Sequence, residues 1–337
     1  SWAPVGGPAS AGHRTVAVRD VEFENGETTL RGQVHTPPGP GPFPAVVLVH
    51  GSGQDSAIEY MYTADFLAAK GVAALVFCKR GTGNSDGDFT FDYAQLAGDV
   101  SAAVDFLATQ GEIDAERIGL CGYSQGGWVA PLAASLNDRV RFVSVAYGMI
   151  ESPTDEAVWE TQDALRAAGV DEAGVDEATP LIRAAVAVVA SGFEEGWDEF
   201  YEQKRATDGA AWRDSFGDNP VGRMLRYPKW ITRMIGPRLA PKGLDWSYSS
   251  DEVLDALDIP MTWLLAPADA SAPNHETIPK LRAYREAGKP FEVVLFDGAD
   301  HGMVAFEEMD DGRTYTGYAN GYFRTEVENV LRMSSGR

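Results

Sequence analysis

The chain has 337 residues, of which 44% are hydrophobic and 23% charged, and its 50 acidic against 28 basic side chains give a net charge of −22. This composition can fill the core of one large α/β domain or two smaller ones, and so acidic a surface argues against nucleic acid or anionic membranes as partners. No apolar run approaches the ~20 residues of a membrane span. The two cysteines, Cys78 and Cys121, are too few for a disulfide framework or a metal cage.

Residues 1–14 are rich in Ala, Pro, Gly and Ser and lack hydrophobic periodicity, which predicts a flexible leader. The chain starts at Ser1 rather than Met, so we expect that any targeting peptide was removed or never included. These features tilt the expectation toward an exported protein, with a cytoplasmic one as the alternative.

Apolar and polar residues alternate between Val16 and Val34 on both sides of Asn25-Gly26, which predicts two antiparallel strands joined by a turn. Continuous apolar runs of about five residues follow, as is typical of parallel strands buried on both faces. The runs cover residues 45–49, 72–77, 117–121, 140–146, 261–265 and 291–296. Segments with helical periodicity separate several of them, so we predict a doubly wound, mostly parallel sheet with an antiparallel start.

Residues 151–250 break the alternation of strands and helices. The segment predicts several helices, among them 155–168 and 181–190, and it contains five of the eight tryptophans. We interpret it as a helical cap or lid inserted into a core formed by residues 15–150 and 251–337. Tryptophans that line a pocket would suit an apolar or aromatic substrate group, whereas tryptophans that form the core of the cap would carry no such information.

The most informative motif is Gly122-Tyr123-Ser124-Gln125-Gly126, between a predicted strand and a predicted helix. In a Gly-x-Ser-x-Gly turn the serine takes a strained backbone conformation, and the small flanking residues allow the close approach that the turn needs. The hydroxyl then stands clear of the sheet at the positive end of the helix. This context predicts Ser124 as a nucleophile rather than as part of an ordinary glycine-rich turn.

A serine hydroxyl needs a base that accepts its proton, and histidine is the usual one. His301 follows the last predicted strand, where a base near the end of the chain can reach the sheet edge. His13 in the leader, His35 near a strand end and His275 in a proline-flanked loop are expected to be surface residues. His50 ends a strand in a glycine-rich loop and is expected to brace the backbone.

The base in turn needs an acid that fixes its tautomer and stabilises the imidazolium. Asp269 follows the predicted strand 261–265, and the chain order Ser124, Asp269, His301 is that of one hydrolase architecture. Other carboxylates stay open as alternatives: Asp297, Asp300, Glu151 and Asp155.

An oxyanion hole requires two preorganised N–H donors, and we expect the backbone amides of Gln125 and Ser52, with Gly53 as the alternative to Ser52. Gly53 and Trp128 are candidate substrate contacts, although Trp128 could equally pack under its helix. The loop around Ser52 lacks the Gly-Lys-Ser/Thr and Gly-x-Gly-x-x-Gly patterns, so nucleotide binding is poorly supported.

Three segments resemble the α/β-hydrolase superfamily, especially bacterial esterases related to dienelactone hydrolase and to the catalytic domain of prolyl-oligopeptidase-like enzymes. They are GPFPAVVLVHGSG (41–53), KRGTGNSDG (79–87) and RIGLCGYSQGG (117–127), together with the Asp269 loop and Asp300-His301-Gly302. The resemblance runs from Thr15 to Leu331 except for the insert, which is longer than expected.

The resemblance implies an eight-stranded α/β-hydrolase fold, with Ser124 as nucleophile, Asp269 as acid, His301 as base and oxyanion amides at Gln125 and Ser52. It implies no metal or organic cofactor. In the usual strand order of the superfamily another strand separates those that end near Cys78 and Cys121, so both thiols are expected to be free.

The sequence therefore predicts a serine hydrolase that cleaves a small-molecule carboxylic ester through an acyl-enzyme. The alternatives are an amidase or peptidase of the same mechanism, or a binding protein that lost its activity. A haloalkane or epoxide hydrolase needs a carboxylate at the nucleophile position of this turn, and the serine found there, Ser124, argues against both. A monomer and a homodimer fit the sequence equally.

Overall fold

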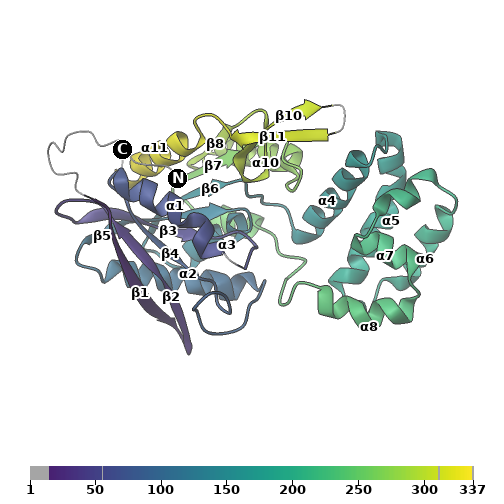
Figure 1. The fold of residues 1–337 in the computed structure, drawn as a ribbon, viewed down its shortest axis with the longest axis horizontal. Helices are drawn as coiled ribbons and strands as arrows, with labels where there is room; N and C mark the ends of the chain where they lie inside the picture. The colour runs from purple at the N-terminus through teal and green to yellow at the C-terminus, as the bar shows by residue number, and fades with distance from the viewer. Residues whose placement is uncertain (1–14, 55, 310–311, 336–337) are drawn as a thin grey trace, which may run out of the picture.

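The computed structural model describes residues 15–54, 56–309 and 312–335, and the leader expected over residues 1–14 lies outside them (Figure 1). A central sheet is covered by helices, and a group of helices lies to one side of it (Figure 1). None of the described helices is both long and apolar enough to cross a membrane.

The central sheet has eight strands in the order β1-β2-β4-β3-β5-β6-β7-β8. They are β1 (Ala17–Asn25), β2 (Thr28–Thr36), β3 (Phe43–Val49), β4 (Ala73–Phe77), β5 (Ile113–Tyr123), β6 (Val140–Ala146), β7 (Met261–Leu265) and β8 (Phe291–Leu295). β1 pairs antiparallel with β2, and β2 with β4, whereas all other neighbours are parallel. The predicted mostly parallel sheet with an antiparallel start is confirmed.

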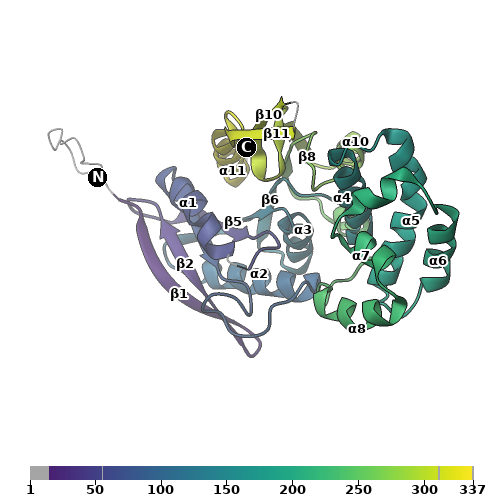
Figure 2. The same cartoon turned by 45° about the vertical axis from the view of Figure 1, so that its right-hand side comes forward.

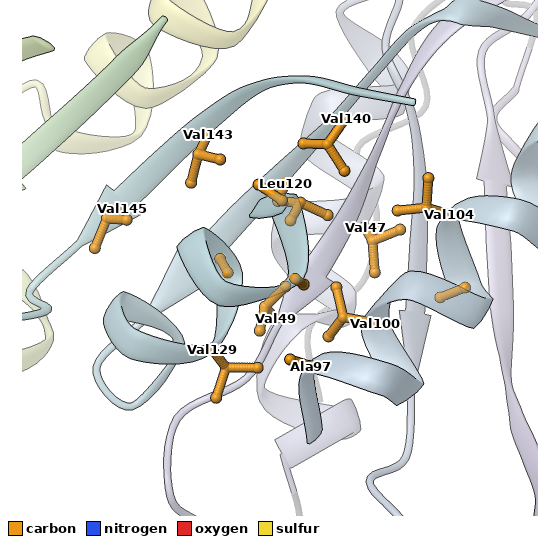
Figure 3. Packing of buried hydrophobic residues seen from close by; sticks show 14 of the residues in the cluster. Val47, Val49, Ala97, Val100, Val104, Leu120, Val129, Val140, Val143 and Val145 are labelled. Atoms are coloured by element: carbon orange, nitrogen blue, oxygen red, sulfur yellow. The ribbon is translucent and has the colours of Figure 1, made fainter. Parts of the chain in front are cut away.

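Helices bury both faces of the sheet, which explains why the central strands are apolar without interruption. Val47 and Val49 of β3 pack with α2 (Tyr93–Ala108) and α3 (Gly126–Leu136) on one face (Figure 3). Their neighbours Val46 and Leu48 point to the other face and pack with α1 (Ser56–Ala69) and α11 (Tyr322–Ser334). Each such buried side chain contributes about 1.5–3 kcal/mol to folding.

Cys121 lies in β5 and Cys78 directly follows β4, with β3 between the two strands. Both cysteines are free, as predicted.

Residues 151–250, here called the helical segment, connect β6 to β7 and have their own hydrophobic core. The segment contains α4 (Pro153–Ala167), α5 (Glu172–Ala190), α6 (Trp197–Ala206), a 3₁₀ helix (Ala211–Phe216), α7 (Pro220–Arg226) and α8 (Lys229–Leu239). Among the helices of this segment, α4 lies nearest to the sheet (Figure 2). Its Thr154 hydroxyl donates to the carbonyl of Trp246, 2.8 Å away, and so joins the two ends of the segment.

The tryptophans of the helical segment have different environments. Trp197 and Trp212 are buried in the core of the segment, whereas Trp230 on α8 is 66% exposed. The ring of Trp159 on α4 lies against that of His275 on α10 (Asn274–Glu286), with centroids 4.5 Å apart and planes inclined by 34°. At least two of the five tryptophans therefore belong to the core of the segment. This is the alternative in which the tryptophans carry no information about the substrate.

A small second sheet, not predicted from the sequence, lies near the end of the chain. β9 (Ala299–Asp300), β10 (Val304–Met309) and β11 (Gly312–Tyr318) form it in the order β11-β10-β9, with antiparallel pairing. After β9 the chain makes one 3₁₀ turn (His301–Met303). Between the helical segment and β7 lies α9 (Asp251–Ala256), whose Leu254 packs into the core beside α3.

Candidate active site

Ser124 lies at the tip of a sharp turn between β5 and α3. Its φ of 51° is in the left-handed region, which is strained for a residue with a side chain. A Cβ on Gly122 would lie 2.4 Å from the carbonyl oxygen of Gly126, and one on Gly126 would lie 2.4 Å from that of Val49. Only glycine fits at both positions, so the sequence fixes a turn that holds the Ser124 hydroxyl above the sheet edge.

The structure brings together the three residues predicted to act with one another. The Ser124 hydroxyl lies 2.9 Å from Nε2 of His301. On the other side of the ring, Nδ1 lies 2.9 Å from Oδ2 and 3.1 Å from Oδ1 of Asp269. With Nδ1–H donating to the carboxylate, the Nε2 lone pair faces the hydroxyl.

The environment of His301 favours a proton on its imidazole. Burial alone would lower the pKa of His301, but the hydrogen bond and charge of Asp269, with further negative charge from Asp300 and Glu160, outweigh burial and raise it. The Asp269 side chain is fully buried, so its attraction for an imidazolium is weakly screened. This arrangement can accept a proton from Ser124 and stabilise the resulting charge.

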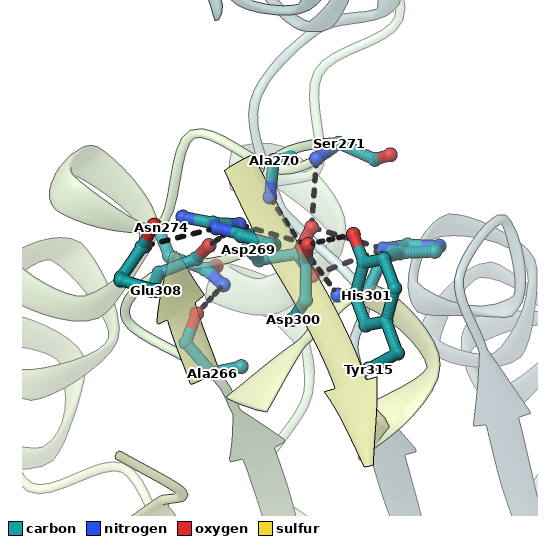
Figure 4. Close-up of polar contacts among 11 residues, drawn as sticks. Ala266, Asp269, Ala270, Ser271, Asn274, Asp300, His301, Glu308 and Tyr315 are labelled. Atoms are coloured by element: carbon teal, nitrogen blue, oxygen red, sulfur yellow. Dashed lines mark hydrogen bonds and ion pairs between the residues drawn. The ribbon is translucent and has the colours of Figure 1, made fainter. Parts of the chain in front are cut away.

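A second carboxylate, Asp300, holds the two loops that carry this site (Figure 4). Its Oδ1 accepts from the backbone N–H groups of Ala270 and His301, at 2.8 and 2.7 Å. Its Oδ2 accepts from Arg313 and from the Tyr315 hydroxyl, at 2.8 and 2.7 Å. Burial would raise the pKa of Asp300, but these four hydrogen bonds outweigh burial and lower it. Asp300 thus bonds the backbone of His301, not its ring.

Two other alternative acids also have partners elsewhere. Glu151 is buried, accepts from the Thr277 hydroxyl and lies 3.2 Å from Nζ of Lys280. Asp155 accepts from the Ser152 hydroxyl at the start of α4. In the described structure Asp269 is therefore the carboxylate that touches the imidazole of His301.

The loop after β3 lies against Ser124. A Cβ built on Gly51 would lie 3.4 Å from Cβ of Ser124. Gln125 is buried, whereas Ser52 and Gly53 are exposed. Within the described residues, the backbone N–H groups of Gln125 and Ser52 donate no hydrogen bond, so both can serve an incoming oxygen.

Trp128, a candidate substrate contact, is 2% exposed. Its Nε1–H donates to the carbonyl of Glu151, 2.8 Å away, and its ring stacks on Tyr93 with centroids 5.2 Å apart. Trp128 therefore packs under α3, as considered from the sequence, and does not occupy the position of a substrate contact.

The helix α4 presents a row of carboxylates toward the site. Glu156, Glu160 and Asp163 are four and three residues apart and share one face of the helix. Burial raises the pKa of each, and the negative charge of Asp269 raises it further; the pKa of Glu156 reaches about 8. Of the three, Glu160 raises the pKa of His301 through its charge, and none of them touches the imidazole ring in the described structure.

The remaining histidines lie elsewhere in the described structure. His35, expected at the surface, is instead buried and lies 2.7 Å from Asp65, whereas His275 is exposed as expected and its ring lies against that of Trp159. His50 is buried and its Nε2 bonds to the carbonyl of Phe77, while burial and the charge of Lys79 lower its pKa to about 3. His13 lies outside the described residues.

Arg313 and Tyr315 are site residues that the sequence analysis did not identify. The segment 312–318 alternates Thr and Tyr after Asp311-Gly312, which is a strand and turn signal. That signal could have predicted the hairpin but not its contact with Asp300. Among the described residues no cluster of three or more His, Cys, Asp and Glu side chains is arranged to hold a metal ion.

Residues 46–312 match the α/β hydrolase family. The chain therefore belongs to this family, in agreement with its strand order and with the strained turn at Ser124.

Three known proteins illustrate the similarity. The chain is 36% identical over 126 residues to thiohydrolase apmlB of Arthrinium phaeospermum, a match that covers 36% of this chain and 40% of the relative. The fold is similar to that of the α/β hydrolase GrgF from Penicillium sp. sh18 (TM-score 0.57, 18% identity, 95% and 98% of the two chains). It is also similar to that of a putative dienelactone hydrolase from Klebsiella pneumoniae (TM-score 0.56, 16% identity, 96% and 100%). The two solved structures establish likeness of fold alone.

Proposed function

We propose that this protein is a serine hydrolase that cleaves carboxylic esters through an acyl-enzyme. The observation that carries the proposal is the continuous chain of contacts from Ser124 through His301 to Asp269. Membership of the α/β hydrolase family supports it.

In the first step Oγ of Ser124 forms a bond to the carbonyl carbon while its proton moves to Nε2 of His301. The electron pair of the carbonyl bond moves onto oxygen, which the N–H groups of Gln125 and Ser52 would bind. When the carbonyl re-forms, the ester C–O bond breaks and the alcohol leaves with the proton from His301. Water then repeats these steps on the acyl-enzyme and releases the acid.

Thioesters are a second candidate substrate class. The 36% identity with a thiohydrolase favours them, although the match covers only two fifths of that relative. The same steps apply, with a thiol as leaving group. Amides, the alternative considered from the sequence, follow the same steps, but their nitrogen must be protonated by His301 before the C–N bond can break.

We also propose that the helical segment covers the bound substrate, since Glu160 of α4 is close enough to His301 to raise its pKa. The apolar or aromatic substrate group expected from the tryptophans has weaker support, because Trp197 and Trp212 lie in the core of the segment. A panel of p-nitrophenyl esters of increasing acyl length, with a matching thioester, anilide and dipeptide, would define the preference.

The decisive experiment is labelling with a fluorophosphonate followed by mass spectrometry. The reagent phosphonylates an activated serine, so we expect a single modified residue, Ser124, and loss of ester hydrolysis in proportion to labelling. Labelling at another residue, or active protein that stays unlabelled, would contradict the proposal.

A further inference from the structure

The segment KRGTGNSDG (79–87) is one of the family-like motifs, yet the steps above give it no task. Its first residue, Lys79, follows β4 at the edge of the sheet where Ser124 lies. The side chain is 2% exposed. A buried ammonium loses its hydration, which is unfavourable unless the protein supplies strong hydrogen-bond acceptors.

Nζ of Lys79 donates to two acceptors beside the nucleophile. One is the carbonyl oxygen of Gly51, in the loop after β3. The other is Oε1 of Gln125, the residue after Ser124, at 3.0 Å. One ammonium group therefore connects the two segments that carry the expected oxyanion donors.

The contact with Gly51 determines the direction of a neighbouring N–H group. The Gly51 carbonyl and the Ser52 N–H belong to one planar trans peptide, in which the two bonds point in opposite directions. When Lys79 holds the oxygen, the N–H points away from Lys79. Gly51 packs against Ser124, so this peptide lies within reach of a substrate carbonyl on Ser124.

The charge of Lys79 acts on the same peptide. An ammonium on a carbonyl oxygen withdraws electron density from the amide, and a charge-assisted hydrogen bond is stronger than a neutral one. Asp99 lines the same small cavity as Lys79, and its carboxylate is joined to Arg80 at 2.6 Å. His50, which lines the same small internal cavity as Lys79, has a lowered pKa and stays neutral.

We propose that Lys79 is a positioning residue for the oxyanion hole: it orients and polarises the Gly51–Ser52 peptide and fixes Gln125, so that both N–H donors face the oxyanion. This inference rests on the proposed function. Lys79 acts through the peptide and does not touch the substrate.

The test compares Lys79→Gln, which keeps a hydrogen-bond donor without the charge, with Lys79→Arg, which keeps the charge. Lys70→Met removes an exposed ammonium and serves as the control. Titration with the fluorophosphonate counts competent sites, so rates refer to folded enzyme. We expect Lys79→Gln to lower kcat about 10- to 100-fold with little change in KM, Lys79→Arg to retain more activity, and Lys70→Met to match the wild type.

A pair of inhibitors separates this role from a structural one. A trifluoromethyl ketone forms a hemiketal oxyanion when Oγ of Ser124 adds to its carbonyl and the proton moves to His301, whereas the matching methyl ketone imitates the substrate. Lys79→Gln should raise the inhibition constant of the trifluoromethyl ketone by the factor by which kcat/KM falls. The inhibition constant of the methyl ketone should not change.

Three results would overturn the inference and assign Lys79 to stability. They are an equal rise in the inhibition constants of both ketones, an unchanged kcat, or failure of both Lys79 variants to fold. Absence of labelling and turnover in the wild type would instead refute the proposed function.

Discussion

The two sides of the candidate active site are built differently. On the sheet side, Ser124, His301 and Asp269 are held by a connected set of hydrogen bonds, which Asp300 extends to Arg313 and Tyr315. On the side of α4, Glu160 acts on His301 only through its charge in the described structure, and burial raises the pKa values of its neighbours Glu156 and Asp163. Groups that perform the reaction gain from a fixed geometry, whereas groups that tune its charge do not require one. Substitutions on the sheet side should therefore have larger effects on rate.

The largest effect is expected from His301→Ala and Ser124→Ala, because each removes a participant in proton transfer or bond formation. Either change should lower kcat by about 10³-fold or more. Steady-state hydrolysis of a p-nitrophenyl ester measures it. His275→Ala is the matched control and should leave kcat near that of the wild type. A comparable loss in the control would contradict the assignment of the base.

Asp269→Asn should have the next largest effect, since an amide cannot stabilise the imidazolium and favours the wrong tautomer. We expect kcat to fall by about 10²- to 10⁴-fold. Asp155→Asn, at the start of α4, is the control. Near-normal rates for Asp269→Asn would transfer the acid role to Glu151 or Asp155.

Asp300→Asn tests whether the hydrogen bonds behind the site matter for rate. The change weakens the acceptors for Ala270 and His301, so the imidazole should lose its alignment and kcat should fall about 10- to 100-fold with KM little changed. The exposed Asp297, three residues earlier, provides the control Asp297→Asn. If kcat is unchanged while the melting temperature falls, Asp300 contributes to stability only.

Glu160→Gln should have the smallest effect and tests the side of α4. The negative charge of Glu160 raises the pKa of His301, so its removal should lower that pKa. The imidazole then loses its proton at lower pH, and the acidic limb of the kcat/KM profile should move to lower pH while the plateau stays the same. Glu202→Gln, on the exposed side of α6, is the control. A shift of the acidic limb to higher pH, or a large loss of kcat/KM on the plateau, would contradict the claim that Glu160 acts only through its charge.

Local patterns in the sequence were enough to predict the sheet and the three candidate residues, Ser124, His301 and Asp269, that the structure brings into contact. Runs such as 45–49 and 261–265 are apolar because both faces of their strands are covered, so burial is encoded in each run separately. The turn at Ser124 is encoded by Gly122 and Gly126, whose neighbours leave no room for a Cβ. The order of residues at the strand ends then placed Asp269 and His301 at the same edge.

Long-range contacts could not be predicted in this way. Asp300 bonds Tyr315, but nothing in the local sequence of either residue specifies the other. A buried lysine with backbone and amide acceptors looks, in sequence, the same as an exposed one. The position of Trp128 stayed open for the same reason, because its place depends on Tyr93 and Glu151 in distant segments.

The hydrogen bond between the two ends of the helical segment has a consequence for how substrate specificity could change. The chain leaves the sheet after β6 and returns at β7, the adjacent parallel strand, and the Thr154–Trp246 hydrogen bond ties the outgoing and returning chains together. Residues 151–250 thus behave as a cassette on two neighbouring attachment points. If the segment covers the substrate as proposed, we expect that a different segment grafted at these two points would change the substrate range and leave Ser124, His301 and Asp269 in place.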